Sequence, residues 1–174
     1  MLSVTGGGTM STMVSVFDVA QYILQTIDAP ISTMKLQKLV YYCQAWHLAW
    51  ENVPLFNEDF EAWANGPVCR ELYNLHRGIF LLSKKDFENI LKENKKTISY
   101  LPKKAQETVD LVIKFYGEKE PAWLSACTHA ERPWKEARGD TPLGQISTNI
   151  ISKDSMLEYY SELSVKSNDK KTVC

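Results

Sequence analysis

The chain has 174 residues, of which 44% are hydrophobic and 11% aromatic, and it carries 20 Lys and Arg against 21 Asp and Glu. This length and composition predict one domain whose core needs neither a disulfide nor a metal. The near-zero net charge argues against strong non-specific nucleic-acid binding, because neutralising phosphates requires a surplus of cations. No apolar run approaches the roughly twenty residues of a membrane span, and no targeting signal is recognisable, so we expect no membrane association and a cytoplasmic location.

Three regions differ in composition. Residues 1–14 are rich in Gly, Ser and Thr and are expected to form a flexible leader, whereas residues 164–174 form a polar, Lys-rich tail. Between them, residues 15–163 show the apolar periodicity of a folded domain. Its first helix is expected to begin at Ser15, which has Asp18 at capping-box spacing, and to stop at Asp28-Ala29-Pro30.

The segment from Thr33 to about Glu51 predicts a helix at the centre of the domain. One apolar stripe along it consists of Leu36, Leu39, Val40, Cys43, Trp46 and Trp50. Apolar residues cover most of the other faces, so that the clearly polar edge is limited to Gln37, Gln44 and Glu51. A helix that is apolar nearly all round is typical of the middle of a domain. We therefore expect a mostly α-helical single domain packed around this helix, with Leu39 and Val40 almost fully buried.

The rest of the domain predicts shorter elements. Phe60–Ala64 is expected to form a short strand, and Gly66-Pro67 to restart a helix, since proline is tolerated at the first helical position. Ile146–Ile151 is apolar and shows no clear preference. The starts of further helices are marked by Ser83, Pro102, Pro121, Pro133 and Ser152.

Few residues are candidates for chemistry. For His47, on the apolar stripe of the central helix, a packed and hydrogen-bonded role is favoured over a proton carrier. His76 lies near a helix end, where a cation is favourable beside the C-terminal carbonyls. Cys127 and His129 are two residues apart and point to different faces of a helix, which suits neither a zinc site nor a nucleophile pair. We predict no catalytic residue, no cofactor, no metal and no disulfide.

A dense group of polar and aromatic residues runs from Thr128 to Trp134 and includes Arg138. It fits a pocket as well as it fits a corner where one helix ends and Pro133 starts the next. The tryptophans expected on loops, Trp63 and Trp134, are candidates for contact with a partner, because aromatic anchors dominate protein interfaces.

Several motifs follow one another in a recognisable order. The central helix carries the run from Met34 to His47, MKLQKLVYYCQAWH. It is followed by Pro54-Leu55-Phe56, Phe60-Glu61-Ala62-Trp63, Gly66-Pro67-Val68, Leu72-Tyr73, Tyr116-Gly117, Leu124, Thr128-His129, Pro133-Trp134 and Ala137-Arg138. Over about Val16 to Leu163 this series resembles the Panacea domain family of bacterial antitoxins, which includes SocA-like and GepA-type phage-associated proteins.

The resemblance implies a mostly helical domain that neutralises a toxin encoded beside it, and one member of the family delivers its toxin to the ClpXP protease. It brings no catalytic residue with it. We therefore expect a toxin protein as the partner. Contact is expected at polar or aromatic positions at element ends, namely Trp63, Gly66, Pro67, His129, Trp134 and Arg138.

Two alternatives remain open. An enzyme of unknown reaction would use a pocket that joins His47, His129 and Arg138, with His129 as acid or base and Arg138 binding an anion. A nucleic-acid-binding regulator would need its lysines on one continuous face, namely Lys84, Lys85, Lys92, Lys95 and Lys96.

Overall fold

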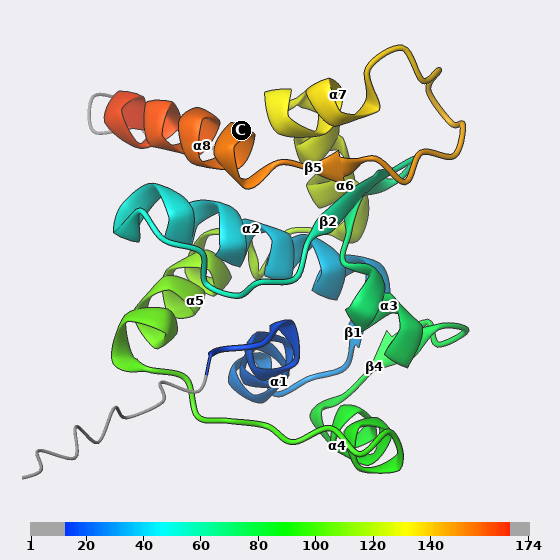
Figure 1. The fold of residues 1–174 in the computed structure, drawn as a ribbon. Coiled ribbons are helices and arrows are strands. Elements are labelled where there is room, and N and C mark those ends of the chain that lie inside the picture. The colour runs from blue at the N-terminus through cyan, green and yellow to red at the C-terminus, as the bar shows by residue number, and fades with distance from the viewer. Residues whose placement is uncertain (1–12, 168–174) are drawn as a thin grey trace, which may run out of the picture.

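The computed structural model describes residues 13–167 (Figure 1), so most of the expected leader and of the expected tail lies outside the described residues. The helices are α1 (Val16–Ile27), α2 (Thr33–Glu51), α3 (Arg70–His76), α4 (Lys84–Glu93), α5 (Lys103–Tyr116), α6 (Pro121–Ala130), α7 (Arg132–Arg138) and α8 (Lys153–Ser167). The strands are β1 (Ile31–Ser32), β2 (Phe60–Trp63), β3 (Gly66–Val68), β4 (Leu81–Leu82) and β5 (Ile150–Ile151). The prediction of a mostly helical fold is confirmed.

Helix α2 lies at the centre of the molecule. It packs against α8 on one side and against α1 and α5 on the other, with α6 covering its N-terminal half (Figure 1). Leu39 and Val40 are fully buried, as expected for a helix whose apolar side chains point in every direction. Trp50, at the end of the apolar stripe, is 36% exposed and lies at the edge of the core.

The helix ends follow the capping signals. Ser15 and Asp18 form the expected capping box of α1, and Asp28 ends that helix in the left-handed region with φ 52°. Ser83 forms a second capping box with Asp86 at the start of α4. These local hydrogen bonds satisfy backbone N–H groups that have no partner within the helix, so these boundaries are readable from sequence.

Two small antiparallel sheets complete the fold. One pairs β1 with β4, and the other has the order β3-β2-β5. The strand expected at Phe60–Ala64 is β2, but the helix expected to begin at Gly66-Pro67 is wrong, because these residues form β3 and the helix begins at Arg70. Gly66 has φ 108°, which continues the turn of the hairpin, and Pro67 is tolerated because β3 is an edge strand.

The expected polar edge of α2 is also wrong for two of its three members. Gln37 is 2% exposed and Gln44 is fully buried. The Gln44 side chain accepts from the Leu55 N–H at 2.7 Å and donates to the Phe56 carbonyl at 2.7 Å. It thus provides the hydrogen bonds that water would otherwise make to the backbone of the segment after α2. Buried amides of this kind are tolerated because their hydrogen bonds are satisfied.

The cysteines differ in state. Cys43 and Cys69 are buried free thiols, whereas Cys127 is disulfide-bonded, so the expectation of a disulfide-free domain is wrong at this position. Among the helices of residues 13–167, none is both long enough and apolar enough to span a bilayer.

Candidate functional site

The hairpin β2–β3 meets the junction of α6 and α7 at one corner of the molecule, and this corner contains all six predicted contact residues. Helix α7 packs against β2 and β5, and α6 packs against β3. Trp63, Gly66 and Pro67 come from the hairpin, while His129, Trp134 and Arg138 come from the two helices. Segments some 60 residues apart in the sequence therefore form one unit, which we call the hairpin corner.

Trp134 fastens α7 to the hairpin. It was expected on a loop, but it lies within α7 and is 3% exposed. Its indole N–H donates to the Trp63 carbonyl at 2.9 Å, and its ring stacks on the His129 imidazole with centroids 4.2 Å apart. A side chain this buried holds the chain together and cannot act as an anchor on a partner's surface.

Arg138 has a similar supporting role. It is 3% exposed, and its guanidinium lies over the Trp134 ring at 4.9 Å. One terminal nitrogen donates to the Ala62 carbonyl of β2, and the other donates to the carbonyls of Pro142 and Gln145. Because both terminal nitrogens are hydrogen-bonded to backbone carbonyls, the guanidinium has a structural role.

Lys38 was not among the sequence-based candidates, yet its amine lies at the centre of the corner. The side chain extends from α2, is 1% exposed, and donates to the Pro67 carbonyl at 3.0 Å. Burial lowers the pKa of Lys38 to about 7. The sequence signal was available: a lysine in the middle of a helix that is apolar all round has no solvent-facing side to occupy.

Gly66 makes the approach of Lys38 possible. A Cβ at this position would lie 2.5 Å from Lys38 Cε and 2.8 Å from the hydroxyl oxygen of Thr128. Both distances are shorter than van der Waals contact. Gly66 therefore has a structural role in the close packing of the hairpin on α2 and α6. The contact with a partner that was expected at Gly66 and Pro67 stays a prediction.

His129 and Trp63 are the partly exposed members of the corner. His129 borders a groove of about 630 Å³ between the start of α2, the Phe80 segment and α6, and its Nε2 has no hydrogen-bond partner among the described residues. Burial lowers the pKa of His129, and the nearby Lys38 and Arg138 act in the same direction. The ring is therefore neutral at pH 7 and cannot supply a positive charge to the groove.

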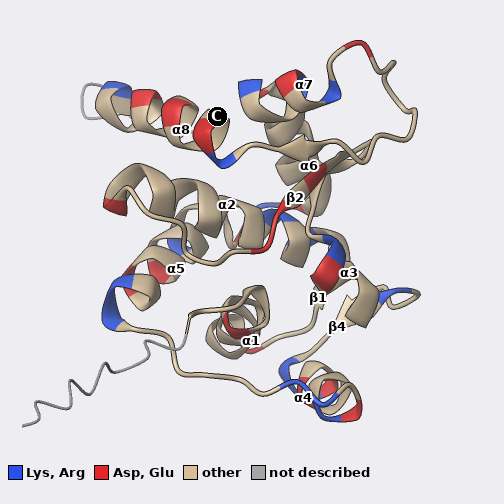
Figure 2. Ribbon diagram, viewed as in Figure 1, with Lys and Arg blue, Asp and Glu red and all other residues tan. Residues whose placement is uncertain are grey.

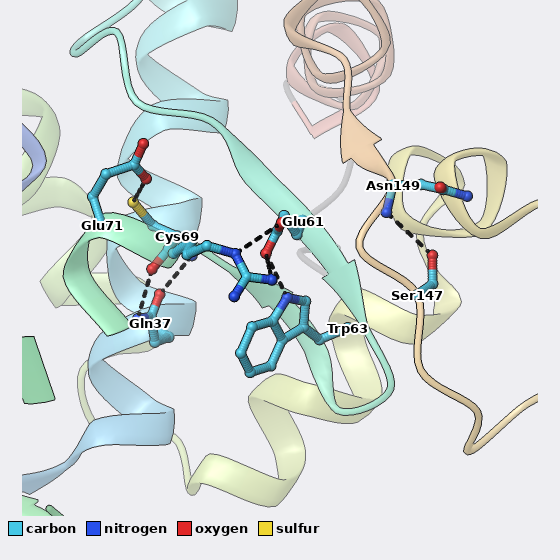
Figure 3. A network of polar contacts seen from close by, with 8 residues as sticks. Gln37, Glu61, Trp63, Cys69, Glu71, Ser147 and Asn149 are labelled. Atoms are coloured by element: carbon cyan, nitrogen blue, oxygen red, sulfur yellow. Dashed lines mark hydrogen bonds and ion pairs between the residues drawn. The ribbon is translucent and has the colours of Figure 1, made fainter. Parts of the chain in front are cut away.

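Trp63 is held on its outer side by charged groups (Figure 3). Its indole N–H donates to Glu61 at 2.8 Å, and the Arg70 guanidinium lies 5.3 Å from its ring centroid and forms an ion pair with Glu61. The same view shows Gln37 bonded to both the N–H and the carbonyl of Cys69, which fixes the start of α3 on α2.

A second buried ionisable group lies where α6 meets α7. Glu131 is 5% exposed and accepts hydrogen bonds from the hydroxyls of Tyr42 and Tyr160, which connects this junction to α2 and α8. Burial raises the pKa of Glu131 to about 7, although the two tyrosine hydrogen bonds act to lower it. Glu131 belongs to the group of polar and aromatic residues from Thr128 to Trp134, but no role for it is predicted from the sequence.

The other two histidines are structural. His47 is 6% exposed and hydrogen-bonds to the Thr108 hydroxyl at 2.8 Å, as its position predicted. His76 is 4% exposed, pairs with the Gln37 amide, and has a pKa lowered by burial. The expectation of a favourable cation at this helix end is therefore wrong, because the ring lies in the core and is neutral.

The enzyme alternative needed His47, His129 and Arg138 in one pocket. His47 is bonded to α5, Arg138 to backbone carbonyls, and only His129 borders the groove. No group of three His, Cys, Asp or Glu side chains within residues 13–167 is arranged to hold a metal ion. The geometry thus gives this alternative no support.

The nucleic-acid alternative needed one continuous basic face. The five lysines lie on α4 and just after it, but Glu88 lies between Lys84 and Lys92 on the same side of the helix, and Figure 2 shows both charges on α4. The mixed charge does not form the surplus of cations that phosphate binding requires.

The fold and the corner therefore define a helical domain whose conspicuous polar and aromatic residues build an internal support. Residues 36–135, more than half of the chain, match the model of the family described as "Antitoxin SocA-like, Panacea domain". The chain belongs to this family, and the resemblance seen in the sequence is confirmed.

One curated relative is "Antitoxin SocA" of Caulobacter vibrioides (strain NA1000 / CB15N), which is 30% identical over 115 residues. The alignment covers 62% of this chain and 60% of the relative, so the chain spans less than two thirds of that relative's length. No solved structure matches the chain significantly.

Proposed function

We propose that this chain is an antitoxin that neutralises a cognate toxin by direct, stoichiometric protein binding. The observation that carries the proposal is the family match over residues 36–135, which runs from α2 into α7 and includes every residue named in the hairpin corner except Arg138. The side chains of Arg138 and Trp134 are engaged in hydrogen bonds to the backbone of the same chain. The role that best fits the corner is therefore binding through the exposed residues beside them.

The groove beside His129 is the face of the corner that we propose for the toxin. Met34 and Phe80 line it and are 38% and 77% exposed, and Asn65 of the hairpin lies at its rim. Exposed apolar residues around a concave surface are typical of protein–protein contact sites. In this arrangement His129 contributes to the groove surface, while Gly66, Pro67, Trp134 and Arg138 hold it in shape. Trp63 is partly exposed but does not line the groove.

Growth rescue tests the proposal. The toxin encoded by the neighbouring gene is induced together with the wild-type chain, with Phe80→Ser, or with Phe115→Ser as a control that removes a 50% exposed phenylalanine from α5. We expect rescue by the wild type and by Phe115→Ser, and loss of rescue by Phe80→Ser at an unchanged melting temperature. Equal rescue by both variants would reject the groove as the binding site for the toxin. Protection of excess toxin by catalytic amounts of the chain, without any protease, would reject stoichiometric binding.

Delivery of the toxin to the ClpXP protease is a further part of the proposal, supported by the family resemblance. The half-life of the toxin distinguishes delivery from simple blocking. We expect the chain to shorten that half-life in cells with ClpX and to leave it unchanged in cells without ClpX. A long-lived toxin that is nevertheless harmless in both strains would restrict the mechanism to binding.

A further inference from the structure

The loop between α7 and β5, residues 139–149, carries a β-turn with an apolar tip. The Gln145 N–H donates to the Pro142 carbonyl at 3.1 Å, which closes the turn over residues 142–145. Gly144 has φ 82°, the conformation required at the third position of a type II turn. Leu143 therefore occupies the tip, where polar residues are usual.

The aliphatic side chains of this turn lie almost completely in solvent. Leu143 is 82% exposed and Ile146 is 89% exposed, and Ile150 on the edge strand β5 is 51% exposed. Single exposed aliphatic residues are normal on protein surfaces. Here three of them lie within one short segment of the chain, and clustered exposed apolar residues are typical of interaction sites.

The loop is fastened to the domain at several points. One terminal nitrogen of Arg138 donates to both ends of the turn, the carbonyls of Pro142 and Gln145, at 2.8 Å each. The Asn149 side chain donates to the Ala137 carbonyl, and the Asn149 carbonyl accepts from the Ala62 N–H. A turn held in this way loses little conformational entropy when it binds.

The charge of the segment indicates the kind of partner. Residues 141–152 contain no Lys, Arg, Asp or Glu. Anionic lipid surfaces and nucleic acids are held by clustered cations, which this segment lacks. An uncharged, apolar pocket on a protein is the complementary surface.

We infer that the turn of residues 142–146 is a recognition element that inserts Leu143 and Ile146 into an apolar pocket of the toxin. The inference rests on the proposed function and extends it to a surface beyond residue 135, where the family match ends. Arg138 acts as a positioning residue, because it joins this turn to the hairpin corner.

The test compares two double variants. Leu143→Ser with Ile146→Ser removes the apolar tip, and Val53→Ser with Val165→Ser removes two aliphatic side chains that are 52% and 73% exposed elsewhere. We expect both variants to melt within about 2 °C of the wild type, because exposed side chains contribute little to stability. Affinity for the purified toxin of the neighbouring gene should fall about tenfold or more for the first pair and stay within about twofold for the second.

The outcomes separate this inference from the proposed function. Wild-type affinity retained by the Leu143 and Ile146 variant would overturn the inference alone, whereas a wild-type chain that neither binds nor neutralises the toxin would overturn both. Two further arms use the chain without toxin. Binding to phosphatidylcholine vesicles, or self-association in sedimentation, that is lost in this variant and kept in the control would also overturn the inference, since the turn would then serve a membrane or a second copy of the chain.

Discussion

Lys38 and Glu131 are both buried ionisable residues, and each has a pKa of about 7. In residues 13–167, Lys38 forms no ion pair and has the neutral Pro67 carbonyl as its hydrogen-bond acceptor. Glu131 is surrounded by tyrosines. Each group loses hydration on folding without gaining an opposite charge, so each makes stability depend on pH.

For Lys38, stability is expected to rise with pH. The unfolded chain keeps the proton up to the ordinary pKa of about 10.5, while the folded chain releases it near 7. Between these values the unfolded state binds more protons, so the free energy of unfolding increases by up to about 1.4 kcal/mol per pH unit. Denaturant titrations from pH 7.5 to 9.5 should show this slope in the wild type but not in Lys38→Met. Lys104→Met, at an exposed lysine, is the control. Parallel curves of unfolding free energy against pH for the wild type and Lys38→Met would contradict the lowered pKa of Lys38.

For Glu131 the sign is opposite. The folded chain holds the proton up to a pH of about 7, whereas the unfolded chain releases it near 4.5. Stability from this group is complete below pH 4.5 and is lost as the pH rises through 7. Glu131→Gln, which cannot ionise, should therefore gain on the wild type by roughly 1 kcal/mol per pH unit between pH 5 and 7. The difference between the two proteins at each pH removes the contribution of histidine ionisation to stability. Glu136→Gln serves as the exposed control.

At the scale of elements, the hairpin β2–β3 depends on a glycine. Gly66 combines a left-handed φ of 108° with contacts that leave no room for a Cβ, whereas Gly78 has φ 82° and open space around it. Both positions strain an L-residue, but only Gly66 adds steric overlap with Lys38 and Thr128.

Alanine substitution separates these two effects. Gly78→Ala should cost about 1 kcal/mol from backbone strain, and Gly66→Ala should cost roughly 1–3 kcal/mol more from overpacking. In a chain of this size that difference lowers the melting temperature by at least about 2–4 °C. Equal melting temperatures for the two variants would mean that Lys38 moves aside without cost.

Elements also differ in how well the sequence predicted them. The helices with their own caps, α1 and α4, begin where Ser15 and Ser83 indicated. The hairpin was misread, because Pro67 suits both the first turn of a helix and an edge strand. Only the pairing of Ala62 with Pro67 decides between them, and that pairing needs two segments to meet.

At the scale of the whole molecule, the contacts of the corner explain why conspicuous residues are a poor guide to a binding face. Trp134 and Arg138 are expected to contact a partner because they are an aromatic and a polar residue at element ends, but their hydrogen bonds are made to carbonyls of the same chain. Phe80 and Leu143 lie in solvent although no sequence feature marks them, and Ile146 lies in solvent although it begins the apolar segment Ile146–Ile151. An exposed aliphatic residue is distinguishable from a core residue only when its neighbours are known.

The sequence by itself determined the helical class, the central place of α2, the capped helix starts and the family, since these follow from periodicity, local hydrogen bonds and motif order within one stretch of chain. The tertiary structure alone decided that Gln37, Gln44 and Glu131 are buried and that Leu143 and Ile146 are exposed. Burial of a polar side chain depends on whether a distant segment supplies its hydrogen-bond partner, as Pro67 does for Lys38. Exposure of an apolar one depends on whether any other element covers it, and neither fact is local to the sequence.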